Sequence, residues 1–484
     1  MARTTLALTS FVSGEFGNKL TGRTDFDKYN SAAKTLENFL VHPQGAATRR
    51  VGTQFIASVK TAAAKTRLIP FEFSTTQTYM LEFGNNYIRF FKDKGQILSG
   101  GNAYEISTPY LTAELFDIKF AQSADVMYLV HPNHEVMILS RTGHTSWTLA
   151  EVAFTDGPYL ATNSTATTLT PASASVGTGV NITASAVTGI NGGAGFLATD
   201  VGRIISFNSG KAKITARTNT TVVVATITTA FTNTNATAAF SLGAFSDTTG
   251  HPSCVSFYEQ RLVFAGTISE PQTVFFSKAG DYENMTSGTN ADDAMVYTIA
   301  ANQVNVIRYL KAQRTLVIGT TAAEYTVSAD GTDASITPTN ITIKRQSSYG
   351  SANVDAVTAG NAILFLQKAK RKIRELAYNF DSDSYVAPDL TILNDTVTNS
   401  GIVQMIWQQE PDNILWCVRD DGQLAALTYQ RSENVVSWHR HILGGVFGTG
   451  NSVVESIASI SGDLNEDELW VIVKRTVNGA TVRY

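Results

Sequence analysis

One unit recurs seven times along the 484 residues, and it limits the choice of fold more than any other feature. Each copy is an apolar segment, a polar turn and a second apolar segment, which is the pattern of a β-hairpin. Five of the six spacings between copies lie between 47 and 55 residues. This period is typical of β-propeller blades, which must stack on neighbours to bury both faces. A β-sandwich with coincidental spacing stays open as the alternative. The first apolar residues of the copies are Tyr79, Val126, Leu262, Leu316, Ile363, Ile414 and Leu469.

The remaining spacing, 136 residues between the second and third copies, predicts an insertion of about 90 residues. From Ala161 to Asp247 the sequence is rich in Thr, Ala, Asn and Gly and carries few charges. Short clusters of Val and Ile, as in 221–227, predict strands, so we expect a small β-barrel domain on the propeller rim rather than a disordered linker.

The chain is therefore predicted to be all-β, a propeller-like platform of hairpin blades with an inserted small β-barrel. The predicted domains are an extended N-terminal arm (1–60), the first blades (61–158), the inserted barrel (159–249) and the remaining blades (250–484). The only helical spacing lies between Tyr29 and Phe39. Because the sequence stops within a predicted strand, we expect the natural chain to continue beyond Tyr484.

Charge and cysteine content narrow the function classes. The 37 basic and 41 acidic residues give a net charge of −4, which argues against a protein that binds nucleic acid by neutralising phosphates. No signal peptide and no apolar run of about 18 residues occurs, so synthesis in a cytoplasm is expected. Cys254 and Cys417 have no metal-ligand spacing and are predicted to be buried thiols.

The sequence contains no recognisable catalytic constellation, so we expect neither an enzyme nor a cofactor. His131 and His134 flank a predicted turn at a spacing that could ligate a metal, but a nearby third ligand is lacking, and no metal is predicted. His439 and His441 alternate along a predicted outer strand, so both imidazoles should face one side. A plain surface strand is favoured there, with a pH-responsive contact as the alternative.

One basic run crosses the turn of the fifth hairpin. It could contact DNA, an acidic partner or lipid headgroups, or simply protect the edge of a sheet with solvated charge. This candidate basic surface patch consists of Lys368, Lys370, Arg371, Lys372 and Arg374.

The first 55 residues resemble the opening of tail nozzle proteins (tail tubular protein B-like) of short-tailed bacteriophages, the podoviruses. Those proteins carry a Gly-Arg-x-Asp-x-x-Lys-Tyr segment, a Leu-x-Asn-Phe segment and a Gly-Gly-x-x-x-Arg-x-Gly-Thr segment. This chain departs from them at Gly45-Ala46, where Gly-Gly is usual. Segments 258–267 and 276–285 are similar to a blade of the same family, and 196–205 resembles a small β-barrel module of phage tail proteins. The matching residues of the opening are Gly22, Arg23, Asp25, Lys28, Tyr29, Asn38, Phe39, Gly45, Arg50, Gly52 and Thr53.

This resemblance implies a structural virion protein, a homohexamer at the distal end of the tail. It would dock on the tail adaptor protein, support tail fibre or spike proteins, contact the host surface and pass double-stranded DNA without sequence-specific binding. The candidate assembly contacts are Arg23, Asp25, Tyr29, Arg49 and Arg50, for which packing on the chain's own propeller is the alternative. We expect deletion of residues 1–50 to leave a folded propeller that fails to join tails. The alternative function is a β-propeller that binds or cleaves glycans in host recognition.

Overall fold

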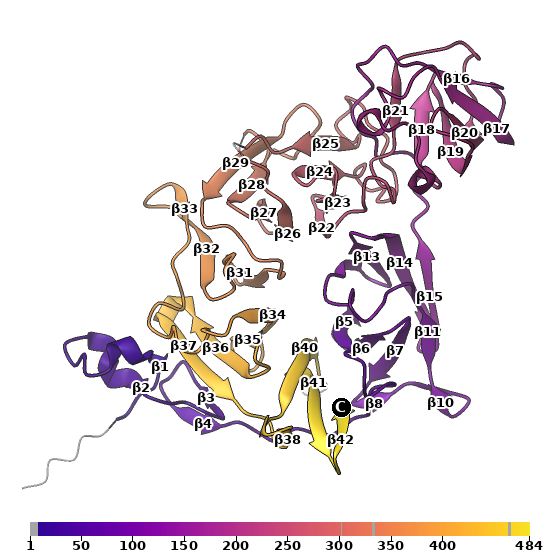
Figure 1. Ribbon diagram of the computed structural model, residues 1–484. Coiled ribbons are helices and arrows are strands. Elements are labelled where there is room, and N and C mark those ends of the chain that lie inside the picture. Colours follow the sequence, from indigo (N-terminus) through magenta and orange to yellow (C-terminus); the bar gives the residue numbers. More distant parts are fainter. Residues whose placement is uncertain (1–7, 302, 332–333, 463–465) are drawn as a thin grey trace, which may run out of the picture.

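The chain is almost entirely β-structure. The computed structural model describes residues 8–301, 303–331, 334–462 and 466–484 (Figure 1). In these ranges the elements are strands and five short 3-10 helices, and none of these helices is long or apolar enough to cross a membrane.

Seven antiparallel sheets stand around a ring as the blades of a β-propeller (Figure 1). Blade 1 contains β5 (Arg67–Ser74), β6 (Gln77–Gly84), β7 (Tyr87–Lys92) and β11 (Glu105–Ser107), with β8 (Gly95–Gln96) beside β7, and the small ribbon β9 (Leu98–Ser99) and β10 (Asn102–Ala103) follows β8. Blade 2 contains β12 (Lys119–Ser123), β13 (Val126–His131), β14 (His134–Gly143) and β15 (Ser146–Glu151). Blade 3 contains β22 (Cys254–Tyr258), β23 (Arg261–Ala265), β24 (Thr273–Phe276) and β25 (Met295–Thr298).

The chain continues around the ring in the same order. Blade 4 contains β26 (Ile307–Ala312), β27 (Leu316–Thr320), β28 (Glu324–Ser328) and β29 (Thr342–Ser347). Blade 5 contains β30 (Val357–Ala359), β31 (Ala362–Leu366), β32 (Ile373–Asn379) and β33 (Ser384–Val386). Blade 6 contains β34 (Ile402–Gln408), β35 (Ile414–Arg419), β36 (Leu424–Gln430), η5 (Arg431–Glu433) and β37 (Val435–His441). Blade 7 contains β40 (Val453–Ser461), β41 (Asp467–Val477) and β42 (Ala480–Arg483), preceded by the ribbon β38 (Val446–Phe447) and β39 (Gly450–Asn451).

The seven predicted hairpins are confirmed. Each is the pair of strands that follows the first, innermost strand of a blade, from β6–β7 in blade 1 to β41–β42 in blade 7. The turns fit this local signal: Asn86 adopts a φ of 62° between β6 and β7, a conformation that Asn tolerates in tight hairpins.

An apolar cluster lies at every junction between neighbouring blades, so no blade keeps an uncovered face. At the junction of blades 1 and 2, Phe71 packs edge-on against Trp147, with ring centroids 4.8 Å apart. The ring closes where Met80 and Phe91 of blade 1 meet Ile472 of blade 7. Each such fully buried side chain contributes about 1.5–3 kcal/mol, so the stacking of blades stabilises the ring as a whole.

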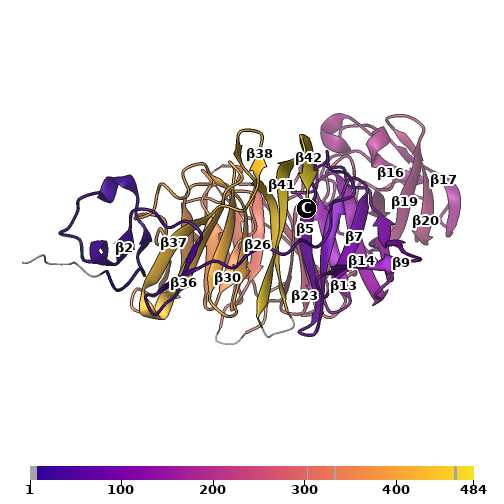
Figure 2. The ribbon, with the colours of Figure 1, turned by 90° about the horizontal axis from the view of Figure 1, so that it is seen from below.

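The N-terminal segment lies on the outer edge of blade 6 and is not a free arm. It contains β1 (Gly14–Glu15), η1 (Asn18–Leu20), η2 (Asp27–Ser31), β2 (Ala32–Ala33), β3 (Phe39–Val41) and β4 (Ala47–Arg49). The helix predicted between Tyr29 and Phe39 is wrong, because the backbone there bonds to β37: Arg440 N–H donates to Leu36 O at 2.9 Å, and Asn38 N–H to Arg440 O at 2.8 Å. Residues 51–66 then run past blade 7 to β5 (Figure 2).

The segment between blades 2 and 3 folds as a six-stranded antiparallel sheet outside the ring (Figure 1). Its order is β16-β17-β20-β19-β18-β21, and an isolated bridge joins Leu169 in the first strand to Thr237 before the last. A core of its own includes Phe196, Ile205 and Phe240. We call this part the inserted module; its closure into a barrel stays a prediction. Its elements are β16 (Leu169–Pro171), β17 (Gly177–Ala184), η3 (Asn191–Gly193), η4 (Ala198–Asp200), β18 (Ile204–Phe207), β19 (Gly210–Arg217), β20 (Val222–Thr229) and β21 (Phe240–Leu242).

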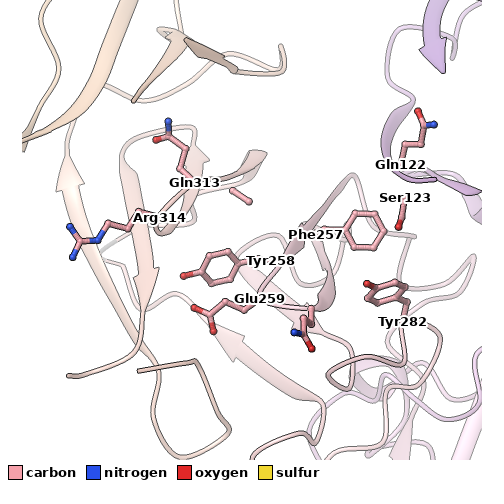
Figure 3. Close-up of a pocket in the computed structure, with 10 residues that line it drawn as sticks. Gln122, Ser123, Phe257, Tyr258, Glu259, Tyr282, Gln313 and Arg314 are labelled. Atoms are coloured by element: carbon pink, nitrogen blue, oxygen red, sulfur yellow. The ribbon is translucent and has the colours of Figure 1, made fainter. Parts of the chain in front are cut away.

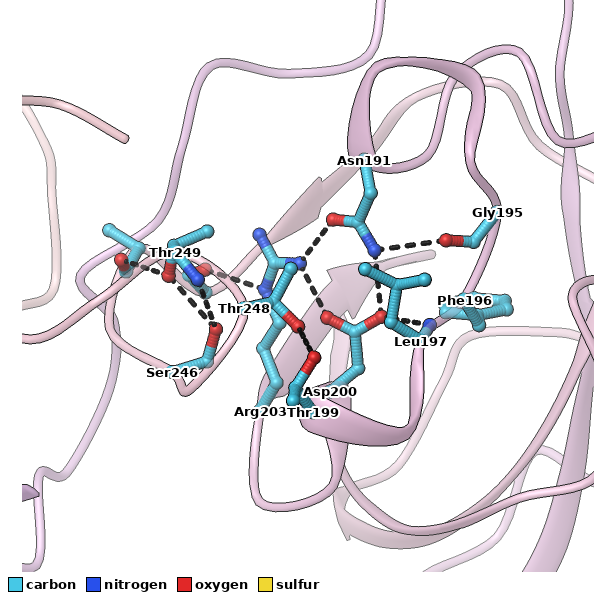
Figure 4. Close-up of polar contacts among 12 residues, drawn as sticks. Asn191, Gly195, Phe196, Leu197, Thr199, Asp200, Arg203, Ser246, Thr248 and Thr249 are labelled. Atoms are coloured by element: carbon cyan, nitrogen blue, oxygen red, sulfur yellow. Dashed lines mark hydrogen bonds and ion pairs between the residues drawn. The ribbon is translucent and has the colours of Figure 1, made fainter. Parts of the chain in front are cut away.

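A buried ion pair organises the inserted module from within (Figure 4). Arg203 donates to Asp200 Oδ1 at 2.9 Å, to Asn191 Oδ1 at 2.7 Å and to the carbonyl of Gly243 at 2.8 Å. Asp200 also accepts the Leu197 N–H at 2.7 Å. Both charged side chains are almost completely buried, so these hydrogen bonds replace the water that each charge loses.

Candidate interaction surfaces

The opening motif is anchored to blade 6 by a buried carboxylate. Glu15, 4% exposed, accepts the Leu36 N–H at 2.8 Å and pairs with Arg440 of β37 at 2.8 Å. Arg440 also reaches Glu37 at 3.2 Å. Gly14 has a φ of +70°, and a Cβ there would overlap the backbone of Trp438, so glycine is needed for this close approach. These contacts hold the start of the N-terminal segment, ahead of the matching motif residues, against blade 6.

The candidate assembly residues fall into two places. Arg23, Asp25 and Tyr29 share one loop between η1 and β2, where Tyr29 Oη accepts the Gly22 N–H at 3.3 Å. The Arg23 guanidinium grips Asp25 with two hydrogen bonds of 2.9 and 2.8 Å, and this hydrogen bonding lowers the Asp25 pKa to about 2. Both side chains are more than half exposed. This loop thus presents an ionised, hydrogen-bonded pair to solvent.

The other two candidates belong to the β3–β4 hairpin. Arg49 is exposed in β4, whereas Arg50 is half-buried and donates to the carbonyl of Val51 at 2.7 Å. Burial lowers the Arg50 pKa. Arg49 is therefore the one of the two whose charge is fully offered to a partner.

The histidine pair on β37 is sealed, so the expectation of a plain surface strand there is wrong. His439 and His441 do share one face, with Nδ1 of the first 2.8 Å from Nε2 of the second, and both are at most 1% exposed. Thr428 Oγ1 lies 3.1 Å from His439 Nε2 and donates to the carbonyl of Val41 at 2.7 Å. Burial lowers the His439 pKa to about 3, and the His441 pKa falls for the same reason. The N-terminal strand β3 covers this face.

The basic run occupies the turn between β31 and β32. Lys368, Lys370 and Arg371 are exposed, and Lys372 pairs with Asp389 at 3.0 Å. Arg374 is not part of this surface and must be corrected. It is 9% exposed, donates to Gln367 Oε1 at 2.9 Å and to the carbonyl of Ala387 at 2.6 Å, and stacks 3.4 Å above the Tyr349 ring. Its planar guanidinium therefore packs inside the propeller and is not offered to a partner.

Side chains cross the centre of the ring between blades on opposite sides. Lys119 of blade 2 pairs with Asp355, just before blade 5, at 3.2 Å, and its ammonium also donates to the carbonyl of Arg308 in blade 4. Nearby, Asn353 donates to Asp117 at 3.0 Å. Nearby charge, chiefly Asp355, raises the Lys119 pKa although burial opposes it. The propeller's own centre is thus bridged at this level.

A cleft of about 500 Å³ opens where the first turns of three blades meet (Figure 3). Phe257 and Tyr282, whose ring centroids are 5.0 Å apart, form an aromatic wall. Gln122, Glu259 and Arg314 add hydrogen-bonding and charged groups around the same space. Because the turns that follow first and second strands lie at opposite ends of a blade, this cleft and the basic turn are on opposite faces of the ring.

The premise that His131 and His134 lack a third ligand is also wrong. Glu114, in the connection between blades 1 and 2, brings its carboxylate to the two imidazoles, and the candidate ligand atoms of all three residues lie within 4.8 Å of one another. Glu114 is 17 residues before His131 in a non-repeating loop, so no spacing rule could have found it.

Both cysteines are free and buried, as predicted. Burial raises the pKa of each thiol, which keeps both in the protonated, unreactive form.

Comparisons with known proteins agree only at the level of architecture. No family model and no curated protein matches the chain. Among solved structures, the β-propeller domain of Myceliophteria thermophila Cps50 (Swd1) aligns with 77% of this chain and 99% of its own length, at 8% identity and a TM-score of 0.35. The Neurospora crassa Pan2 WD40 domain aligns with 73% of this chain and 87% of its own length, at 8% identity and a TM-score of 0.32. Kluyveromyces lactis Hsv2p aligns with 77% of this chain and 97% of its own length, at 9% identity and a TM-score of 0.31. The chain is a β-propeller by its own seven sheets; similarities this low carry nothing about its role.

Proposed function

We propose that the chain is a structural wall subunit of a short bacteriophage tail, the nozzle at its distal end, located in the virion. The observation that carries the proposal is the N-terminal segment. Within it, the motif residue Asn38 donates its N–H to Arg440 O at the edge of blade 6 at 2.8 Å, and Arg23 and Asp25 form an ion pair on an exposed loop. A paired, pre-ordered charge of this kind suits docking on another rigid protein, because little side-chain freedom remains to be lost.

The proposed channel for DNA lies between several copies of the chain and not through one propeller. A duplex cannot pass a ring centre bridged by Lys119 and Asp355 at 3.2 Å. Blades stacked by apolar clusters at every junction give each subunit the stiffness that a wall needs. The net charge of −4 supports passage of DNA without retention.

Electron microscopy of the purified chain, alone and mixed with its tail adaptor complex, tests this function. The expected result is six-fold rings that dock on the adaptor. The variant Arg23→Glu places like charge beside Asp25 and should abolish docking while the monomer stays folded. Lys278→Ala, which removes a less exposed ion pair of 2.9 Å with Asp292 in blade 3, is the control and should dock normally. Wild-type chains that stay monomeric and ignore the adaptor would refute the nozzle.

The cleft favours glycan recognition as the second candidate function. An aromatic wall of Phe257 and Tyr282 beside Glu259 and Arg314 is a combination that can stack on a sugar ring and bond its hydroxyls. A glycan array probed with the wild type and with Phe257→Ala tests this function. If the wild type binds a glycan, Phe257→Ala does not, and the chain forms no rings, glycan recognition is supported over the nozzle.

A further inference from the structure

The turn between β13 and β14 and the connection before blade 2 bring together three side chains that bind metals. His134 Nε2 lies 2.9 Å from Glu114 Oε2, and the His131 and His134 ring centroids are 5.0 Å apart. The candidate ligand atoms of Glu114, His131 and His134 lie within 4.8 Å of one another. Ligand atoms about 2.0–2.1 Å from one tetrahedral ion stand about 3.4 Å apart, so small rotations of the side chains suffice to enclose an ion.

A backbone contact fixes one of these ligands. Glu114 Oε2 accepts the Leu111 N–H at 2.8 Å, which orients the carboxylate. His131 is 2% exposed, and the other two residues are partly open to solvent. An ion could therefore enter a site that is already largely ordered.

A buried hydroxyl beside the cluster lacks a hydrogen-bond partner. Tyr110 is completely buried, its ring lies edge-on to His134 with centroids 5.2 Å apart, and its Oη makes no hydrogen bond to any residue in the described ranges. A water on a bound ion would satisfy this hydroxyl.

We propose that Glu114, His131 and His134 form a site for one zinc-class divalent cation. Two imidazoles and one carboxylate match the ligand preferences of Zn²⁺ and leave a fourth position for water. The ion would join the connection between blades 1 and 2 to the β13–β14 turn. His251 donates its backbone N–H to the carbonyl of Pro132 in this turn at 3.0 Å, so the chain returning from the inserted module is held at the same place. This inference does not depend on the proposed function.

The chain offers a matched comparison within itself. His42 pairs with Asp412 at 2.9 Å, the same distance as His134 to Glu114, and it also bonds Thr48. No group of three ligands forms around His42 among the residues that the structure describes. A substitution there removes one histidine–carboxylate contact without touching the proposed site.

Competition for Zn²⁺ against a chromophoric chelator, with the untagged full chain at pH 7.5, tests the proposal. We expect one Zn²⁺ per chain and a rise in Tm of about 2–5 °C with excess Zn²⁺. His134→Gln and Glu114→Gln, at partly exposed positions that tolerate change, should each weaken the affinity at least about tenfold and remove the Tm shift. His42→Gln should bind like the wild type. Co²⁺ should give the visible spectrum of a low-coordinate site in the wild type and lose it in both site variants.

Two results would overturn the site. One is a wild-type affinity no tighter than that of Glu114→Gln, since the carboxylate would then be a plain hydrogen-bond partner of His134. The other is equal loss of Zn²⁺ in His42→Gln, which would make the binding a general property of surface histidines. Both readouts use folded protein, checked by its Tm without metal.

Discussion

The ring carries two additions that are attached in opposite ways. The N-terminal segment gives its backbone and buried side chains to blade 6, through Glu15–Arg440 and the cover that β3 lays over His439. The inserted module keeps its own core, and its chain enters and leaves side by side, with Tyr159 and Gly243 in an isolated bridge. The N-terminal segment covers part of the core of blade 6, whereas the inserted module has a core of its own. The position of an addition on the rim therefore does not show whether the stability of the ring depends on it.

Deleting residues 1–50 should have the largest effect on the stability of the ring, and it tests whether the ring needs the N-terminal segment. The deletion uncovers β37 and removes Phe16, Leu36 and Val41 from the core, at about 1.5–3 kcal/mol each, so the ring should lose about 5 kcal/mol or more. Urea unfolding followed by tryptophan fluorescence measures it. The structure thus argues against the expectation that a folded propeller survives this deletion.

Excision of the inserted module is the control for that deletion. Because Leu160 N–H donates to Leu242 O at 2.8 Å, a short Gly-Ser link can join the chain there. The urea concentration at which half of the ring is unfolded should change little. If the two deletions destabilise the ring equally, the contrast between the additions is lost.

Arg203→Met should unfold the inserted module and spare the ring. It leaves Asp200 buried without its cation, a change that costs about 3–5 kcal/mol. Calorimetry should show the transition of the module moving to lower temperature while that of the ring stays. A single transition that moves as a whole would mean that the two parts unfold together.

Acid should act on the junction of the N-terminal segment with blade 6. The folded-state pKa of His439, about 3, lies below its unfolded value, so the unfolded chain takes up the proton first as pH falls. The stabilising contribution is complete above about pH 6.5 and is lost toward pH 3, at about 1.4 kcal/mol per pH unit. Urea midpoints between pH 7 and 4 should fall less steeply in His439→Gln than in the wild type. Parallel slopes for the two proteins would contradict this.

Arg23→Ala should have the smallest effect on stability, because both partners of this ion pair are largely exposed. Thermal unfolding should hardly distinguish the variant from the wild type. A large loss of Tm would mean that this loop supports the fold, and the residue could then no longer be read as a contact reserved for a partner.

What the sequence could predict depended on how far apart the interacting residues are. Hairpins depend on neighbouring residues, so all seven were found, and turn residues such as Asn86 fit them. Burial of His439 depends on a strand about 400 residues away, and Arg374 is buried because a hydrogen bond and the Tyr349 ring hold it inside. Glu114 reaches His134 from a loop without periodicity. Partners brought together only by blade stacking leave no local pattern.

Closure of the ring sets an order of events during synthesis. Val59 N–H donates to Arg483 O at 3.1 Å, and Leu68 N–H to Ser456 Oγ at 3.0 Å, so the first sheet finds its neighbour only among residues made almost 400 positions later. Until the ribosome has released that stretch, one apolar face of blade 1, which includes Leu68 and Met80, stays exposed to solvent and prone to aggregation. A nascent chain stalled before residue 453 would be a target for chaperones, whatever the completed ring goes on to do.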